Sequence, residues 1–174
     1  MRQNQAPVIV MRGAAPRRAL VAAAIALLVG SAAARAGVTC SVTTAGVAFG
    51  TYSPLATVAD VSVGTIKVTC NHTAGAAATA NYTLQLSAGS SGVFNPRDMA
   101  SGTKKLGYNL YKDAAHTQIL GTGSGGTYTI TGSLTVSNGV PTQSQSYSLY
   151  GQVPAQQDVG AGSYSDAIVA TLNY

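Results

Sequence analysis

The residues of this chain that could do chemistry are few, and its two cysteines are the most informative. Cys40 and Cys70 could form a disulfide, or they could bind a metal ion together with His72 and His116. Zinc sites usually contain close ligand pairs such as C-x-x-C, and the sequence has no such pair. In an exported protein, an even number of cysteines is typical of disulfides. We therefore expect Cys40 and Cys70 to be joined, which closes a loop of about 31 residues.

The other polar residues do not indicate a catalytic site. A Ser–His–Asp triad would need support from a motif such as G-x-S-x-G, which is absent, and both histidines lie in expected loops. The five aspartates are scattered and mostly sit at turns, so they do not predict a pair of catalytic carboxylates. The glycine-rich segment 121–126 lacks the lysine and the spacing of a phosphate-binding loop. We expect neither enzymatic activity nor a cofactor.

Residues 1–36 have the pattern of a secretory signal peptide. Three arginines within 12–18 precede an apolar run at 19–29, and Ala-Arg-Ala at 34–36 is an A-x-A cleavage site. The apolar run has about 11 residues, whereas a helix that spans a membrane needs about 20. We therefore expect residues 1–36 to be removed during export, and the mature protein to have no membrane span.

Removal of this segment changes the charge of the protein. The whole chain has a formal net charge of +5, with ten basic and five acidic residues. Five of the basic residues lie within 1–36 and all the acidic ones lie after it, so the remainder is formally neutral. The basic excess therefore belongs to the signal and does not indicate nucleic-acid binding. This holds whether Met1 or Met11 is the start.

Residues 37–174 are predicted to form one all-β domain. They contain no Glu or Trp and are rich in Thr, Ser, Gly and Val, which disfavours long helices and favours strands. Seven segments are expected to be strands: 38–42, 64–70, 81–87, 105–112, 127–136, 147–153 and 164–174. Gly132 predicts a bulge or a bend in the fifth of them. Strands at this spacing, separated by turn residues and without helical periodicity, predict a β-sandwich.

The last expected strand has no later segment to pair with it. Ile168, Ala170, Leu172 and Tyr174 alternate with polar residues and so share one face. An exposed strand edge is an aggregation hazard, and this one has no Lys or Pro to protect it. The strand is therefore either paired on both sides by earlier strands or meant to receive a partner.

Seven short motifs follow one another in a fixed order and span nearly all of residues 37–174. They are FGTYSP at 49–54, GTIKVTC at 64–70, YTLQLSAG at 82–89, RDM at 97–99, LGYNLYKD at 106–113, YGQVPAQQ at 150–157 and GSYSDAIVATLNY at 162–174. The ordered set resembles the spore coat protein U domain, the fold of archaic (Csu-type) chaperone–usher pilins. The resemblance implies an immunoglobulin-like β-sandwich that lacks its final strand, with an apolar groove beside the last strand present.

The resemblance also implies how such a groove is filled. A periplasmic chaperone lends a strand first, and the N-terminal extension of a neighbouring pilin subunit then replaces it by β-augmentation. The third implied partner is an outer-membrane usher. The expected groove wall is Ile168, Ala170, Leu172 and Tyr174, or the opposite face with Val169 if the register shifts by one residue. Without a donor, we expect the edge of the last strand to be bare.

One feature departs from a shaft pilin. Only Gly37, Val38 and Thr39 would precede Cys40 after cleavage, and three extended residues reach about 10 Å, too short to donate a strand. The protein is therefore expected to be a tip or terminating subunit that accepts a strand, reaches the fimbrium through the periplasm, and serves adhesion or biofilm formation. The alternative is a self-sufficient secreted surface or matrix protein that does not polymerise.

Overall fold

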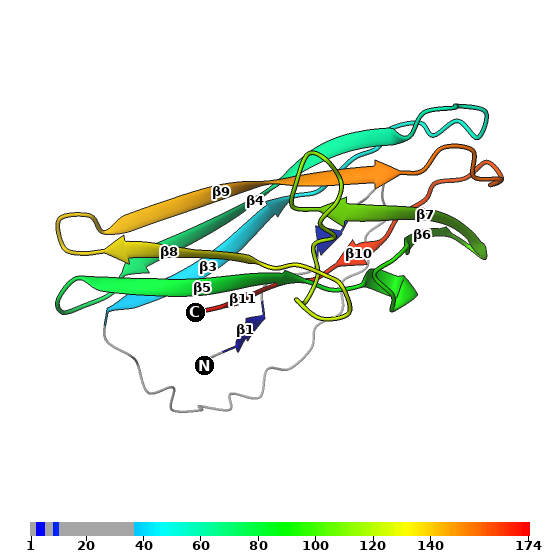
Figure 1. The fold of residues 1–174 in the computed structure, drawn as a ribbon. Helices are drawn as coiled ribbons and strands as arrows, with labels where there is room; N and C mark the ends of the chain where they lie inside the picture. Colours follow the sequence, from blue (N-terminus) through cyan, green and yellow to red (C-terminus); the bar gives the residue numbers. More distant parts are fainter. Residues whose placement is uncertain (1–2, 6–8, 11–36) are drawn as a thin grey trace, which may run out of the picture.

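The computed structural model describes residues 3–5, 9–10 and 37–174, and nearly all its regular structure is β-strand (Figure 1). The strands are β1 (Gln3–Gln5), β2 (Ile9–Val10), β3 (Val38–Ala45), β4 (Asp60–His72), β5 (Ala78–Leu86), β6 (Arg97–Ser101), β7 (Lys104–Tyr111), β8 (Ile130–Val136), β9 (Thr142–Val153), β10 (Ala167–Ile168) and β11 (Ala170–Asn173). A 3₁₀ turn, η1, covers Gly89–Ser91. Within these ranges, no helix is long and apolar enough to cross a membrane.

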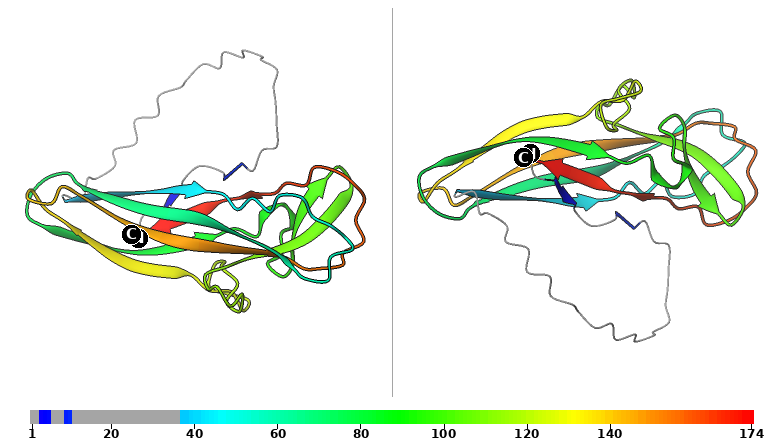
Figure 2. Two further views of the ribbon diagram at one scale, coloured as in Figure 1. Left: turned by 90° about the horizontal axis from the view of Figure 1, so that it is seen from above. Right: turned by 90° about the horizontal axis from the view of Figure 1, so that it is seen from below.

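The strands form two sheets that pack face to face (Figure 2). One sheet has the order β1-β11-β5-β8 and the other has the order β3-β4-β9-β7-β6, while β10 pairs with β2. Every pairing between named strands is antiparallel. The expected all-β sandwich is therefore confirmed.

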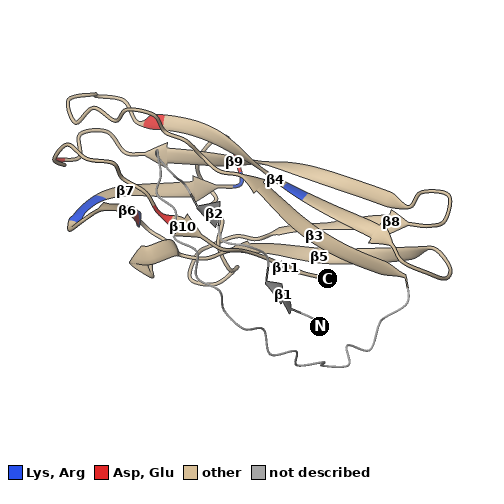
Figure 3. Ribbon diagram, turned by 180° about the vertical axis from the view of Figure 1, so that it is seen from behind, with Lys and Arg blue, Asp and Glu red and all other residues tan. Residues whose placement is uncertain are grey.

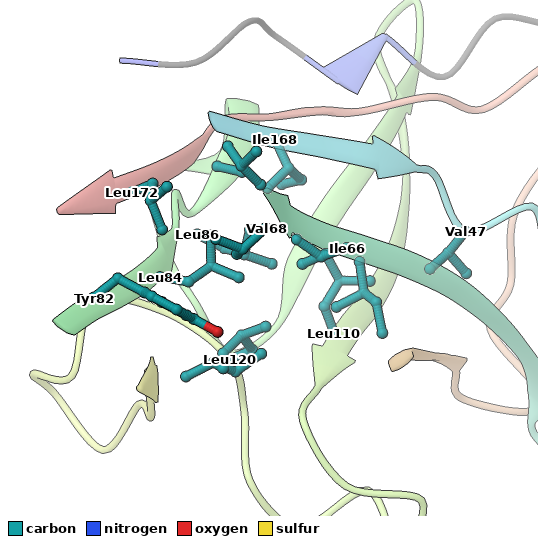
Figure 4. Close-up of a cluster of buried hydrophobic side chains, with 14 of the residues drawn as sticks. Val47, Ile66, Val68, Tyr82, Leu84, Leu86, Leu110, Leu120, Ile168 and Leu172 are labelled. Carbon is teal, nitrogen blue, oxygen red and sulfur yellow. The ribbon is translucent and has the colours of Figure 1, made fainter. Parts of the chain in front are cut away.

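The core lies between the two sheets and follows from the alternation along the strands. In β4, Ile66 and Val68 are fully buried while Thr65 and Lys67 are exposed, as a strand with one wet face requires. Leu84 in β5 and Leu172 in β11 meet them from the other sheet (Figure 4). Charged residues are sparse on the ribbon, in agreement with the composition (Figure 3).

Some strand predictions are wrong in detail. Strands β4 and β9 are longer than expected. The extra residues 60–63 of β4 pair with 150–153, and the extra residues 142–146 of β9 pair with 67–71. The fifth segment is a strand only from Ile130 onward, and the last segment is divided at Val169 into β10 and β11. The alternation of apolar and polar residues cannot locate such breaks, because a residue outside the hydrogen-bonded ladder can still fit the alternating pattern.

The bulge predicted at Gly132 is also absent. Gly132 pairs directly with Tyr82 in an unbroken register between β5 and β8. The space above it is taken by two phenol groups, since an added Cβ would lie 2.5 Å from Tyr82 Oη and 2.6 Å from Tyr147 Oη. Glycine is therefore required here by close side-chain approach, which is a second common reason for glycine in a strand.

Strand β6 was not expected at all. Its first residue, Arg97, is fully buried, and its partner across the ladder is Tyr108 in β7. Arg97 and Met99 face inward on alternate positions, so the strand does follow the period of two. Because one of the inward residues is a charged arginine, the pattern of hydrophobic residues did not predict this strand.

Candidate functional site

Cys40 and Cys70 occupy directly opposed positions on β3 and β4 and are joined by a disulfide. Their Cα atoms lie 4.0 Å apart, and both residues are buried. The sulfur atoms are bonded to each other, so the alternative of a metal site built on these cysteines is wrong. The bond fixes the start of β3 to the end of β4.

The two histidines lie apart in loops or at strand ends and have different neighbours. His72 Nε2 lies 3.2 Å from the carbonyl oxygen of Ala76. The His116 ring contacts the ring of Tyr111 edge-on, with 5.2 Å between centroids. Among the residues that the structure describes, no three potential metal ligands come together.

The last two strands place three of the four expected groove-wall residues in the core. Ile168, Ala170 and Leu172 are each about 1% exposed, and Tyr174 is partly buried against the same core. Ala170 lies opposite Leu86 on β5. Leu172 lies opposite Leu84 on the same strand, and Figure 4 shows both leucines in the core. Val169 is half-buried and belongs to the other face.

The backbone of these strands presents hydrogen-bonding groups on the side away from β5. The Ser87 N–H donates to the carbonyl oxygen of Val169, and the Val169 N–H donates to Ser87 Oγ, both at 2.9 Å. Because successive residues of a strand point their N–H and C=O groups to opposite sides, Ile168 and Ala170 direct theirs away from β5. We call this side of β10 and β11 the acceptor edge.

The acceptor edge is paired in this structure, so the expectation of a bare edge is wrong. Strand β1 pairs with β11, with Asn4 opposite Leu172, and β2 pairs with β10, with Ile9 opposite Ile168. Both strands come from residues 1–36. Unpaired N–H and C=O groups along an edge bind an extended segment that can reach them, and here the N-terminal segment of the same chain does so.

A buried polar cluster beside the start of β10 was not predicted. Asp166 accepts hydrogen bonds from Tyr108 Oη at 2.7 Å and from the N–H of Ala167 at 2.8 Å. Burial raises the pKa of Tyr108, and the hydrogen bond to Asp166 adds to the increase. Burial also lowers the pKa of Arg97, whose Nη1 donates to Asn109 Oδ1 at 2.6 Å. The period-two spacing of Arg97 and Met99 was the signal that could have located this cluster.

Comparisons with known proteins agree with this architecture. The sequence model of the Spore Coat Protein U domain family matches residues 26–171, a range that includes the disulfide and most of the acceptor strands. Protein U of Myxococcus xanthus is 33% identical over 133 residues, which cover 72% of this chain and 70% of that protein. Both similarities extend over most of the sandwich.

Proposed function

Because this chain belongs to the spore coat protein U domain family, a family of structural surface proteins, we propose that it is a subunit of a chaperone–usher surface pilus. The observation that carries the proposal is the acceptor edge. Among the described residues, the strands that pair with this edge are β1 and β2, and both come from residues 1–36. If that segment is removed on export, the edge needs a strand from another chain.

Removal of residues 1–36 is itself part of the proposal. The basic region, the short apolar run and the A-x-A site support cleavage after residue 36. The mature domain then begins at Gly37, passes through the periplasm and reaches the cell surface. Its partners are a periplasmic chaperone, an outer-membrane usher and a neighbouring subunit.

The place proposed for the subunit is the tip or another terminating position, where it would serve adhesion or biofilm formation. The start of the mature chain supports this, because Val38 pairs with His72 as the first residue of β3. Gly37 is also held, since its carbonyl oxygen accepts a hydrogen bond from the Thr73 N–H at 3.1 Å. Thus the first residues after the cleavage site are held in the domain and do not form a free donor extension.

Co-expression tests this proposal. The full chain is produced in a bacterial periplasm with and without the chaperone encoded nearest to its gene. We expect a one-to-one complex with the chaperone and aggregation without it. As a matched pair, Leu172→Asp should abolish the complex because it places a charge on the inward face, whereas Thr171→Asp on the outward face should leave it intact. A mature protein that stays monomeric and soluble without any chaperone contradicts the proposal.

A second candidate is a self-sufficient surface or matrix protein, and the pairing of β1 and β2 with the acceptor edge favours it. In that case the chain completes its own sandwich and has to retain residues 3–10. The intact mass of the exported protein separates the two functions. A mass that starts at Gly37 supports strand acceptance, and a mass that includes residues 3–10 supports the self-completed protein.

A further inference from the structure

The acceptor strand is interrupted at Val169, and a side chain bridges the interruption. In a regular ladder the Val169 N–H would donate to the carbonyl oxygen of its partner Ser87. Here it donates instead to Ser87 Oγ, while the Ser87 N–H donates to the Val169 carbonyl oxygen. Ser87 therefore binds both backbone groups of Val169, one through its backbone and one through its side chain.

The carbonyl oxygen of Ser87 is occupied by Arg97. The guanidinium donates to it from Nε at 3.3 Å and from Nη2 at 3.0 Å, and Nη2 also donates to the carbonyl oxygen of Leu120 at 2.7 Å. Arg97 is completely buried, and its charge is stabilised by these carbonyls and by the face of the Phe94 ring, 5.0 Å away. This contact occupies the carbonyl oxygen of Ser87, while Ser87 Oγ accepts from the Val169 N–H at 2.9 Å and from the Gly89 N–H at 3.4 Å.

Asp166 fixes the other end of the short strand β10. Besides the contacts to Tyr108 and Ala167, its Oδ1 accepts from the Ser90 N–H at 2.9 Å and from Ser90 Oγ at 2.8 Å. The carboxylate is almost fully buried, so losing these donors would leave a desolvated charge. None of these donors comes from residues 3–10, so the contacts do not depend on the strand that occupies the acceptor edge.

We propose that Ser87 and the Asp166–Ser90 contact form a brace that holds residues 167–170 in the binding conformation before a donor strand arrives. This inference rests on the strand acceptance proposed above. Strand β10 has two residues and β11 has four, whereas a usual strand has about 5–6, so backbone pairing alone holds them weakly. An ordered edge binds a strand without first losing conformational entropy, so the brace acts on the association rate.

Amide hydrogen exchange on the full chain, in which residues 3–5 and 9–10 pair with the acceptor edge, tests the brace without a second chain. The variants are Ser87→Ala and Ser90→Ala, and the matched control is Ser91→Ala, because Ser91 Oγ contacts only the carbonyl oxygens of Ala88 and Val93 and the Val93 N–H. The informative amides are those of Ile168 and Ala170, which neither serine contacts directly. We expect about tenfold faster exchange there in both brace variants, with β4 unchanged. Exchange at the wild-type rate in both variants overturns the proposal.

Strand binding tests the link to function. The probe is a fluorescein-labelled peptide with the sequence of residues 1–12, added to the exported protein, and anisotropy gives both rate constants. In Ser87→Ala and Ser90→Ala we expect the association rate to fall about tenfold and the dissociation rate to change less than about threefold. Ser91→Ala should match the wild type. A general loss of stability would instead raise dissociation and lower the unfolding midpoint.

The failures of the two proposals are distinguishable. If the wild-type protein does not bind the peptide, strand acceptance fails, and the exchange experiment still decides whether residues 167–170 are braced. If the wild type binds and both brace variants associate at the wild-type rate, strand acceptance stands and the brace is wrong.

Discussion

The β3–β4–β9 ladder and the β10–β11 strand show two different ways of holding a strand in this sandwich. Strand β9 has 12 residues paired along β4, and β3 has eight residues and a disulfide to the same strand. Strand β11 has four residues, and β10 has two, with a polar side chain bridging the break between them. The first region is held by long ladders within residues 37–174, whereas the second is held by side-chain contacts and pairs with strands from outside that range.

The largest effect expected is on the self-supporting region. Replacement of both cysteines, Cys40→Ala with Cys70→Ala, should lower the free energy of unfolding by about 3–4 kcal/mol, because a loop of about 31 residues is no longer closed in the unfolded chain. Urea unfolding followed by tyrosine fluorescence measures the change. Reduction of the wild type with dithiothreitol is the control and should give a similar loss. A loss below about 1 kcal/mol would mean that the long ladders alone stabilise this region.

A pair of core truncations makes the comparison sharper. Ile66→Ala in β4 should lower the free energy of unfolding by about 3 kcal/mol with or without residues 1–36, because Ile66 is fully buried and both strands beside β4 lie within residues 37–174. Leu172→Ala should lower it by a similar amount in the full chain but only by about 1–2 kcal/mol in the exported form. Thr171→Ala on the outward face should change it by less than about 0.5 kcal/mol.

Urea titrations of the full chain and of the exported form give these values. Equal costs for Leu172→Ala in the two forms would show that the surroundings of this leucine do not depend on a strand at the acceptor edge. The difference between the two regions would then be one of length only.

The fold was largely predictable from the sequence because period-two alternation and turn residues are local signals. The disulfide was predicted from the expected export of the protein and from its two cysteines. The inward face of the last strand was predicted from the spacing of Ile168, Ala170 and Leu172. The strand at Arg97 and the break at Val169 did not follow. They depend on hydrogen bonds between residues far apart in sequence, such as Arg97 to Leu120 and Ser90 to Asp166.

The occupant of the acceptor edge could not be predicted for a different reason. A strand edge selects its partner through backbone groups that every residue has, so many extended segments satisfy it. Residues 1–36 were assigned to export from their composition, and composition gives no information about which edge a segment can reach. Only the register of Asn4 against Leu172 and of Ile9 against Ile168 indicates this pairing.

Two glycines at the 3₁₀ turn after β5, which lies against Asp166, provide the next test. Gly89 and Gly92 both have left-handed backbone angles, with φ of 76° and 73°, so alanine is strained at either position. An added Cβ at Gly89 would also overlap Asp166 Oδ2, whereas nothing lies within 4 Å of one at Gly92. Gly92→Ala should lower the free energy of unfolding by about 1 kcal/mol and Gly89→Ala by about 2–3 kcal/mol.

Thermal unfolding measures both glycine variants against the wild type. The excess cost at Gly89 reports the rigidity of the Asp166 contacts. Equal costs would indicate that Asp166 moves aside easily, and the region would then be held less firmly than its hydrogen bonds suggest.

The smallest effect concerns the hydroxyl pair that links the two sheets. Tyr82 in β5 and Tyr147 in β9 belong to opposite sheets, and their Oη atoms lie 2.6 Å apart. Tyr82→Phe removes this hydrogen bond and should lower the free energy of unfolding by about 1 kcal/mol at neutral pH. Urea midpoints measured at pH 7 give this value, with Tyr128→Phe on the exposed surface as the control.

The same variant predicts a change in pH dependence. Burial, and next the hydrogen bond to Tyr147, raise the pKa of Tyr82 in the folded protein. The unfolded chain then ionises first, so this tyrosine stabilises the fold below pH about 10, and that contribution decreases as the pH rises further. The free energy of unfolding of Tyr82→Phe should therefore fall less than that of the wild type between pH 9 and 11. It should still fall to some extent, because the pKa of Tyr108 is also raised by burial. Identical slopes in the two proteins would place Tyr82 in contact with water, and the two sheets would then lack a buried polar link at this point.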